Sequence, residues 1–276
     1  MESVQVELEM HSHIDDIHAA KRHAVEEQYS GLIATGHIYK SFGLTFVPRV
    51  LEYYGKQYNR VLDAGCGQCA VVTYLKRLKR DVYGVELSTA ALQQELCPPL
   101  MAQGRVRQST LAKIPWPDRH FDLLFSSDVL EHIPTFDIPE VIREMVRVTK
   151  GDVFMSISLR RAHDDPKPPA EPTIHVTVQP REWWDKQFKN VGCTVNQAAL
   201  DSVLAGRDLN LEPWLFSYRC GDLASTPMVV KALTKDPLWT HNVPKGRLLK
   251  PRIIHRRFDG SPYFPNEAVI TGRLGV

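Results

Sequence analysis

The sequence predicts an α/β fold in which a mostly parallel sheet carries helices on both faces. The first observation is alternation: between Arg60 and Ser158, short apolar runs alternate with amphipathic segments of helical spacing. The second is a glycine-rich turn, residues 65–67, which joins the first apolar run directly to a helix. Such alternation indicates parallel strands, because each parallel strand needs a crossover segment that returns the chain to the same edge of the sheet.

The individual elements follow from local signals in chain order. Apolar residues at helical spacing predict two leading helices, over 14–29 and 44–54. We expect strands at 60–65, 81–88, 105–110, 121–128 and 152–158, and a last antiparallel pair at 193–203 and 212–220. We expect helices at 69–80, 89–96 with Ser88 as cap, 138–150 with Gly151 as stop, and 180–192. The proline-rich, charged segment 160–173 predicts a loop.

The composition is that of an ordinary globular protein. Of 276 residues, 43% are hydrophobic and 24% are charged. No stretch approaches the roughly 18 consecutive apolar residues of a membrane span, and we expect no secretory signal, because the first residues are acidic and histidine-rich. The five cysteines favour a reducing compartment over a disulfide framework. We therefore expect a cytoplasmic protein.

The charge is unevenly distributed. The segment 222–276 holds nine Lys and Arg residues against four Asp and Glu residues, although the whole chain carries a net charge of only +2. A basic extension is typical of a partner that bears phosphate, but a solvated surface segment explains the same residues. Both interpretations remain open from the sequence.

Three kinds of chemistry are compatible with the turn. Cys66 and Cys69 have the spacing of a redox or metal-binding pair. Cys66, however, lies between two glycines, and Cys97, Cys193 and Cys220 stand alone in the sequence, so no second pair completes a Cys₄ zinc site. We expect Cys66 and Cys69 to be small turn and packing residues.

A carboxylate distinguishes the two remaining possibilities, a dinucleotide site and an S-adenosylmethionine site. Asp63 precedes the first glycine by two residues, and Glu86 ends the next expected strand. An acid at the second position can accept hydrogen bonds from the ribose hydroxyls of either cofactor. Asp63 beside the turn would repel a pyrophosphate, by about 1 kcal/mol or more at a few ångströms, and would attract an ammonium group. The pair therefore favours S-adenosylmethionine.

Four motifs in order resemble those of the class I S-adenosylmethionine-dependent methyltransferases, especially the methyltransferase type 11 group: "VLDAGCGQCAVVTYL", "VYGVELS", "STLAKIPWPDRHFDLLFSSDVLEHI" and "IREMVRVTKGDVFMSIS". The resemblance covers about residues 60–158. It implies a Rossmann-like, doubly wound, seven-stranded sheet with one antiparallel strand. It also implies a methyltransferase domain over 1–221, with its core at about 58–160 and an acceptor-side insert at about 159–185. We expect the basic extension 222–276 to pack on the same domain.

The resemblance also assigns roles to individual residues. Asp63, Gly65 and Gly67 match the loop that contacts the methionine end of the cofactor, Glu86 matches the ribose-binding acid, and Leu87 would flank the adenine. Thr110 replaces the acid that many relatives carry before the next turn, so a contact to adenine is expected there from the backbone of Leu111. The loop that faces both cofactor and acceptor supplies the remaining candidates: Ser127 near the cofactor, and Asp128 and His132 as catalytic residues.

The sequence predicts methyl transfer from S-adenosylmethionine to a small-molecule or glycan acceptor. One alternative is a nucleic acid or another phosphate-bearing acceptor that binds the basic extension, and a second is a non-catalytic subunit of the same fold. Asp128, His132, His163 and His175 are candidates for a general base, which an oxygen acceptor would favour. The acceptor pocket is expected from the N-terminal region through residue 43, the loop 159–173 and the stretch 174–184.

Two further clusters have ordinary structural explanations. His11, His13, Asp15, Asp16, His18 and His23 are compatible with a metal site, but a polar leading helix explains them equally, and we expect no metal. Trp183 and Trp184 are compatible with a stacking surface for an acceptor ring. For two adjacent tryptophans on a helix, we expect instead one core residue and one partly exposed residue.

Overall fold

The computed structural model describes residues 2–34, 41–159, 174–205 and 214–221, together with 255–256 and 262–263; side chains are described from residue 16. The chain divides into two units, one formed by 1–160 and 174–235 and the other by 161–173 and 236–276. Of the second unit, the structure describes two short antiparallel strands, β8 (His255–Arg256) and β9 (Pro262–Tyr263). Most of the basic extension, and the whole proline-rich segment 160–173 with His163, lie outside the described residues.

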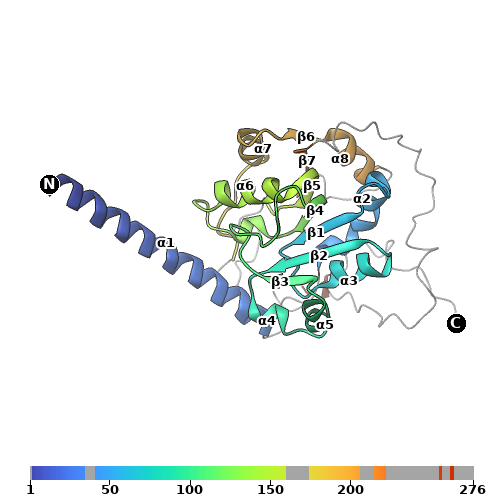
Figure 1. Cartoon of the computed structure of the whole chain (residues 1–276), viewed down its shortest axis with the longest axis horizontal. Helices are drawn as coiled ribbons and strands as arrows, with labels where there is room; N and C mark the ends of the chain where they lie inside the picture. The colour runs from blue at the N-terminus through green and yellow to red at the C-terminus, as the bar shows by residue number, and fades with distance from the viewer. Residues whose placement is uncertain are drawn as a thin grey trace. The chain divides into compact units, whose positions relative to one another are not determined.

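The first unit is built on a seven-stranded sheet with the order β3-β2-β1-β4-β5-β7-β6 (Figure 1). The strands are β1 (Arg60–Ala64), β2 (Asp81–Glu86), β3 (Val106–Gln108), β4 (Phe121–Ser127), β5 (Thr149–Ser156), β6 (Thr194–Val195) and β7 (Leu215–Arg219). β7 runs antiparallel to both of its neighbours, and the other adjacent pairs are parallel. This arrangement confirms the predicted Rossmann-like fold. The order reverses between β1 and β4, the place where open α/β sheets bind ligands.

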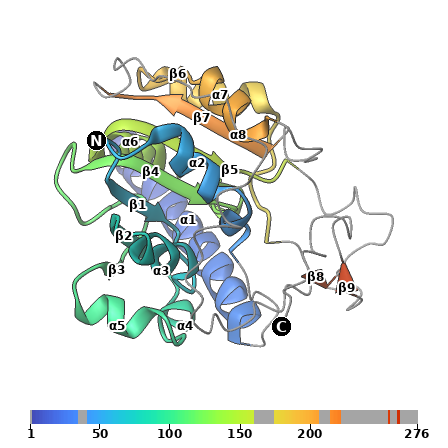
Figure 2. The ribbon, with the colours of Figure 1, turned by 90° about the vertical axis from the view of Figure 1, so that its right-hand side faces the viewer.

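The helices of the first unit cover both faces of the sheet (Figures 1 and 2). They are α1 (Glu2–Ala34), α2 (Val47–Tyr54), α3 (Ala70–Arg77), α4 (Thr89–Leu92), α5 (Cys97–Ala102), α6 (Ile138–Val148), α7 (Arg181–Asn190) and α8 (Gln197–Leu204), with 3₁₀ turns η1 (Phe42–Thr45) and η2 (Leu130–His132). Successive residues of a strand point to opposite faces, so each central strand serves two cores. In β1, Val61 packs with α2, α3 and α8, whereas Leu62 packs with α6 and α7.

Several predicted boundaries were wrong for local reasons. The predicted strand 193–203 is a strand only at Thr194–Val195, because the Asn196 side chain accepts a hydrogen bond from Ala199 N at 3.2 Å and starts α8. Gly151 lies inside β5 and does not end α6. The leading helix is much longer than predicted. The helix predicted over 89–96 begins after Ser88, its expected cap, but ends already at Leu92.

The cysteines form two disulfides, which corrects the prediction that Cys97, Cys193 and Cys220 stand alone. Cys69 is bonded to Cys97, with 5.5 Å between their Cα atoms, and Cys193 is bonded to Cys220, with 4.5 Å. Cys66 is the free cysteine and is buried. Cys66 and Cys69 therefore do not form the pair that their spacing suggests. The partners lie 28 and 27 residues apart, and only the folded sheet brings them together.

The described helices include none with the length and apolar character that a membrane crossing requires. The disulfides remove the argument for a reducing compartment that rested on the cysteine count. A cytoplasmic location therefore remains a prediction.

Candidate active site

The turn after β1 needs glycine for steric reasons. Gly65 has a φ of 78°, and a Cβ at this position would lie 2.5 Å from Cγ2 of Val129. Gly67 has a φ of 50°. The backbone N–H groups of Gly65 and Cys66 both donate to Val85 O, at 2.9 and 3.0 Å, so the turn is held against the end of β2.

Two carboxylates are buried beside this turn. Asp63 is 3% exposed near the end of β1, and Glu86 is 5% exposed at the end of β2. Burial raises the pKa of Asp63 to about 8, with a further contribution from the charge of Glu86. Burial also raises the pKa of Glu86, although three backbone hydrogen bonds oppose the shift. Two acids in one desolvated site favour a cationic ligand, whose charge would compensate theirs.

Glu86 is fixed by the backbone around it. Its Oε2 accepts from Gly67 N at 2.8 Å, and its Oε1 accepts from Leu87 N at 2.9 Å and Ser88 N at 2.8 Å. A carboxylate offers about four acceptor positions. Binding both hydroxyls of a ribose would therefore require one of the three backbone donors to move.

The loop after β4 carries a carboxylate in a strained backbone position. Asp128 has a φ of 52°, in the left-handed region that favours glycine. Its backbone N–H donates to Ser156 O at 3.1 Å, and the Ser156 hydroxyl donates to its Oδ1 at 2.8 Å. Burial raises the pKa of Asp128 to about 6, and the hydrogen bond from Ser156 opposes the shift. A carboxyl group with this pKa can accept a proton near neutral pH.

A second acid follows three residues later. Glu131 is 0% exposed; its Oε1 accepts from Ser158 N at 3.0 Å, and its Oε2 is buried without a hydrogen-bond partner. Burial, reinforced by the charge of Asp128, raises the pKa of Glu131 well above its usual range. His132, beside it, has its pKa lowered to about 4 by burial and by His175. His132 is therefore a weak base at neutral pH, which does not favour the predicted role as general base.

Helix α1 lies near both the loop after β4 and the segment after β2. Tyr29 lies between the two, with its ring centroid 6.2 Å from that of His132 and its hydroxyl 3.7 Å from the position of a Cβ on Gly67. The Ser30 and Ser88 hydroxyls are 3.0 Å apart. Arg22 forms a two-point ion pair with Asp137, with both N–O distances at 2.7 Å. The N-terminal region thus contributes to the site, although residues 35–40 lie outside the described part of the chain.

The central part of the chain has counterparts among known proteins. Residues 62–157 match the sequence profile of a family described as methyltransferase domain. The probable S-adenosylmethionine-dependent methyltransferase Rv3030 of Mycobacterium tuberculosis is 29% identical over 98 residues, which is 36% of this chain and 34% of the relative. The part of the chain formed by residues 62–157 belongs to the class I S-adenosylmethionine-dependent methyltransferases.

Other relatives of this methyltransferase domain agree. A malonyl-[acyl-carrier protein] O-methyltransferase of Halorhodospira halophila is 36% identical over 93 residues, 33% of this chain and 31% of that protein. The chain therefore matches about a third of the length of these curated relatives. The solved structure of the PH0226 protein from Pyrococcus horikoshii OT3 has a TM-score of 0.51 at 19% identity, covering 64% of this chain and 89% of that one, and supports the fold.

The other predicted cofactor residues lie at or just after the ends of β2, β3 and β4. Leu87 is 38% exposed. Thr110 is also exposed, whereas the Leu111 side chain is buried in the core beside α6. The Gln108 amide donates to Leu87 O at 3.0 Å and to Thr89 Oγ1 at 2.8 Å, so it fixes the segment after Glu86. Ser127 ends β4, next to Asp128.

Three neighbours of the predicted site residues were not singled out from the sequence: Tyr29, Glu131 and Ser156. Glu131 carried a signal in the pattern Asp128-x-x-Glu131-His132, which places two acids and a histidine on one short turn. Tyr29 and Ser156 carried none, because each reaches the site from an element distant in sequence.

The described residues of the remaining predicted clusters make ordinary packing and polar contacts. His18 stacks on Phe136, with ring centroids 3.6 Å apart, and His23 pairs with Glu27 on the same helix, with 3.4 Å between Nε2 and Oε1. The side chains of His11, His13 and Asp15 lie outside the described residues. Trp184 is fully buried and Trp183 partly exposed, as the structural interpretation of the pair predicts.

Proposed function

We propose that this protein transfers the methyl group of S-adenosylmethionine to a neutral small-molecule or glycan acceptor. The observation that carries the proposal is the pair of buried carboxylates, Asp63 and Glu86, at the glycine turn of a class I methyltransferase domain. In this assignment Asp63 attracts the methionine ammonium group, Gly65 and Gly67 allow close approach of the backbone, and Glu86 accepts from the ribose.

The chemistry requires alignment more than activation. The sulfonium methyl group is already electrophilic, so the protein has to hold donor and acceptor in line and exclude water. Asp128 is suited to take the proton of an acceptor hydroxyl as the new carbon–oxygen bond forms. The electrons of the broken carbon–sulfur bond stay on sulfur, which gives neutral S-adenosylhomocysteine.

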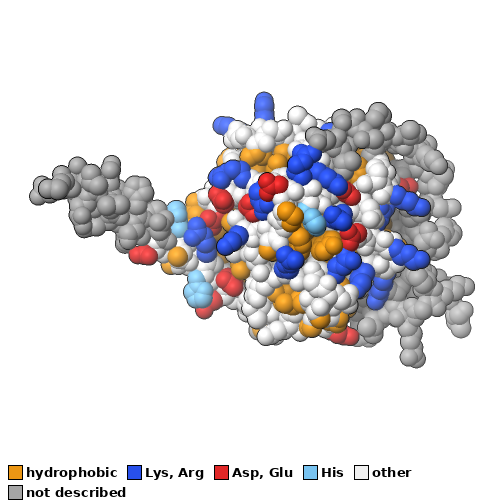
Figure 3. Space-filling model, in the orientation of Figure 1, with side chains coloured by type: hydrophobic (Ala, Val, Ile, Leu, Met, Phe, Trp, Pro, Cys, Tyr) orange, Lys and Arg blue, Asp and Glu red, His pale blue; other side chains and the backbone are white. Residues whose placement is uncertain are grey.

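The charge of the site supports an uncharged acceptor. Four acidic side chains, Asp63, Glu86, Asp128 and Glu131, are gathered at this edge of the sheet, and each one that is ionised would repel a phosphate. On the face drawn in Figure 3, Lys and Arg side chains are interspersed with acidic ones. The nucleic-acid alternative depends on the basic extension, most of which lies outside the described residues.

Two measurements test the proposal. Calorimetry with S-adenosylmethionine on the purified chain should show one binding site, and absence of binding would contradict both the cofactor assignment and the activity. Incubation with radiolabelled S-adenosylmethionine and fractionated extract of the source organism should label a small molecule or glycan. Label found in nucleic acid, together with RNA or DNA binding that falls steeply with salt, would instead support the alternative. Cofactor binding without methylation of any fraction would favour a non-catalytic subunit.

A further inference from the structure

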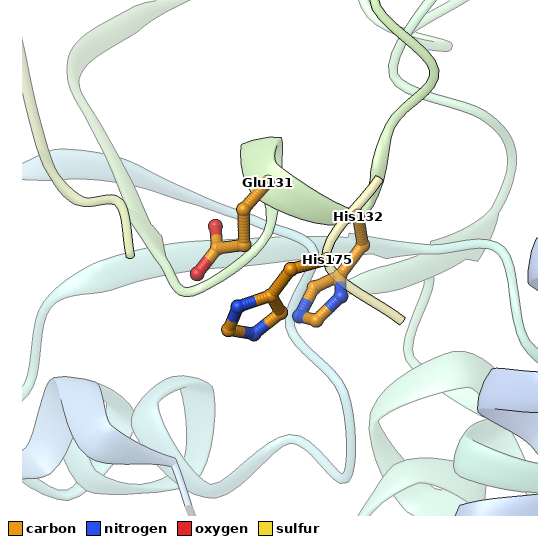
Figure 4. A group of neighbouring side chains, drawn as sticks. All are labelled: Glu131, His132 and His175. Carbon is orange, nitrogen blue, oxygen red and sulfur yellow. The ribbon is translucent and has the colours of Figure 1, made fainter. Parts of the chain in front are cut away.

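We propose that Glu131, His132 and His175 bind a divalent first-row transition-metal ion, such as Mn²⁺, Co²⁺ or Zn²⁺, on the acceptor side of the site. Ligand atoms of these three side chains all lie within 4.8 Å of one another, and no other such group occurs among the described residues (Figure 4). Two imidazoles and one carboxylate form a ligand set that these ions accept, with coordination positions left for other ligands. With bonds of about 2.1 Å, ligands on opposite sides of an ion are about 4.2 Å apart, so small side-chain rotations close the site.

Glu131 supplies the strongest reason to expect a cation. Its side chain is completely buried, and Oε2 has no hydrogen-bond donor. Within the described part of the chain, no Lys or Arg forms an ion pair with it. A buried carboxylate without compensation is costly, and the two histidine rings beside it are where a compensating ion would be bound (Figure 4).

His132 is oriented as a metal ligand. Its Nδ1 lies 3.0 Å from Ile174 O, and a carbonyl oxygen only accepts, so Nδ1 carries the proton. The lone pair of Nε2 is then available to a metal. A backbone carbonyl that fixes the tautomer in this way is the usual outer partner of a metal-binding histidine.

His175 is brought to the cluster by backbone pairing between two distant segments. Val176 N and Thr177 N both donate to Glu131 O, at 2.9 and 3.0 Å, and the Thr177 hydroxyl donates to Ile133 O at 2.6 Å. The rings of His132 and His175 meet edge to face, with centroids 4.9 Å apart. The ligand positions are therefore largely set by the fold before an ion binds.

The place of the cluster suggests what the ion does, and this step rests on the proposed function. Tyr29 contacts the region of Gly67 on one side and His132 on the other, so the ion would lie near the transferred methyl group. An acceptor hydroxyl bound to the ion becomes more acidic and is held in position. Its proton passes to the Asp128 carboxylate, and its oxygen forms the bond to the methyl carbon as the carbon–sulfur bond breaks.

The test is metal binding to the full chain, freed of metal by a chelator and titrated with Mn²⁺, Co²⁺, Zn²⁺ and Mg²⁺. We expect one equivalent of a transition metal per chain, and Co²⁺ spectra typical of nitrogen and oxygen ligands. His175→Ala and Glu131→Gln should each weaken binding at least tenfold, while His23→Ala, which removes an exposed histidine of α1, should leave it unchanged. Circular dichroism checks that each variant is folded.

The outcomes separate this proposal from the proposed function. Absence of a bound metal, or binding that survives both His175→Ala and Glu131→Gln in folded protein, would overturn the metal site. Calorimetry with S-adenosylmethionine on the same metal-free protein tests the cofactor assignment independently. Cofactor binding without metal binding would refute only the metal site, and metal binding without cofactor binding would refute only the proposed function.

Discussion

Gly67 donates its backbone N–H to Oε2 of Glu86 at 2.8 Å, which joins the glycine turn after β1 to the end of β2. The same carboxylate accepts from Leu87 N and Ser88 N. One side chain therefore fixes the two loops that, in the proposed function, hold the methionine and ribose parts of S-adenosylmethionine. Loss of this carboxylate should affect both the ligand contact and the shape of the turn.

Replacement of Glu86 by Ala should weaken S-adenosylmethionine binding by more than tenfold, because the ribose acceptor and the anchor of Gly67 are lost together. A tenfold loss corresponds to about 1.4 kcal/mol. Calorimetry measures the affinity, and Glu95→Ala, which removes an exposed acid nearby, is the matched control. Unchanged affinity in Glu86→Ala would refute the assignment of this residue.

Cofactor binding should release a proton from Asp63. With a pKa of about 8 in the free protein, Asp63 is mostly protonated at pH 7, and an ammonium group favours its charged form. Calorimetry at pH 7 in buffers of different ionisation enthalpy should count most of one proton released by the wild type and none by Asp63→Asn, which should bind more than tenfold more weakly. Asp201→Asn, on the surface of α8, should behave as wild type. Equal proton release in Asp63→Asn and wild type would contradict this role.

The same residue should make the unliganded protein less stable as pH rises. The folded pKa of Asp63, about 8, lies above the unfolded value of 3.8, so the folded state binds more protons between these values. Its contribution to stability is fully present below about pH 4 and is lost as pH rises through about 8. Thermal unfolding across this range should show a smaller decline in Asp63→Asn than in wild type, and parallel declines would contradict the raised pKa.

The Cys69–Cys97 disulfide should stabilise both the fold and the cofactor turn. It closes a 28-residue loop, for which chain-entropy arguments give about 3–4 kcal/mol, and Sγ of Cys97 lies 3.5 Å from Gly67 O. Cys97→Ser should therefore lower stability in denaturant titrations and also weaken S-adenosylmethionine binding. Cys220→Ser, which opens the 27-residue loop away from the turn, should lower stability similarly without changing affinity. Equal affinities in the two variants would show that the first disulfide does not support the turn.

The methylation rate should depend on the protonation of Asp128. Because its pKa is about 6, the rate should fall as pH drops through this value, where the carboxylate gains a proton. Asp128→Asn should lower kcat by about a hundredfold or more at neutral pH. Ser156→Ala removes the hydrogen bond that opposes the pKa shift, so the midpoint of the pH–rate profile should move upward. A midpoint that stays in place in Ser156→Ala would argue against Asp128 as the base.

The arrangement of the residues proposed to bind the cofactor could largely be predicted from the sequence. Asp63, Gly65, Gly67 and Glu86 lie at strand ends and in a turn, and parallel strands bring their carboxyl ends to one edge whatever the details of packing. The sheet itself was predictable because the alternation of apolar runs and amphipathic segments depends on local residues. The error at 193–203 arose where a single cap, Asn196, outweighed the strand propensity around it.

The arrangement of the residues proposed to lie beside the acceptor depended on contacts that no local pattern encodes. His175 lies 43 positions after His132 in the chain, and backbone pairing to Glu131 makes them neighbours. Tyr29 comes from α1, and the disulfide joins Cys97, at the start of α5, to Cys69, just before α3. The sequence by itself determined the fold and the cofactor chemistry, because turns, strand ends and periodicity are local. Only the tertiary structure decided the disulfides, the pKa values of the acids and the Glu131–His132–His175 cluster, because burial and proximity between distant segments exist only once the sheet has formed.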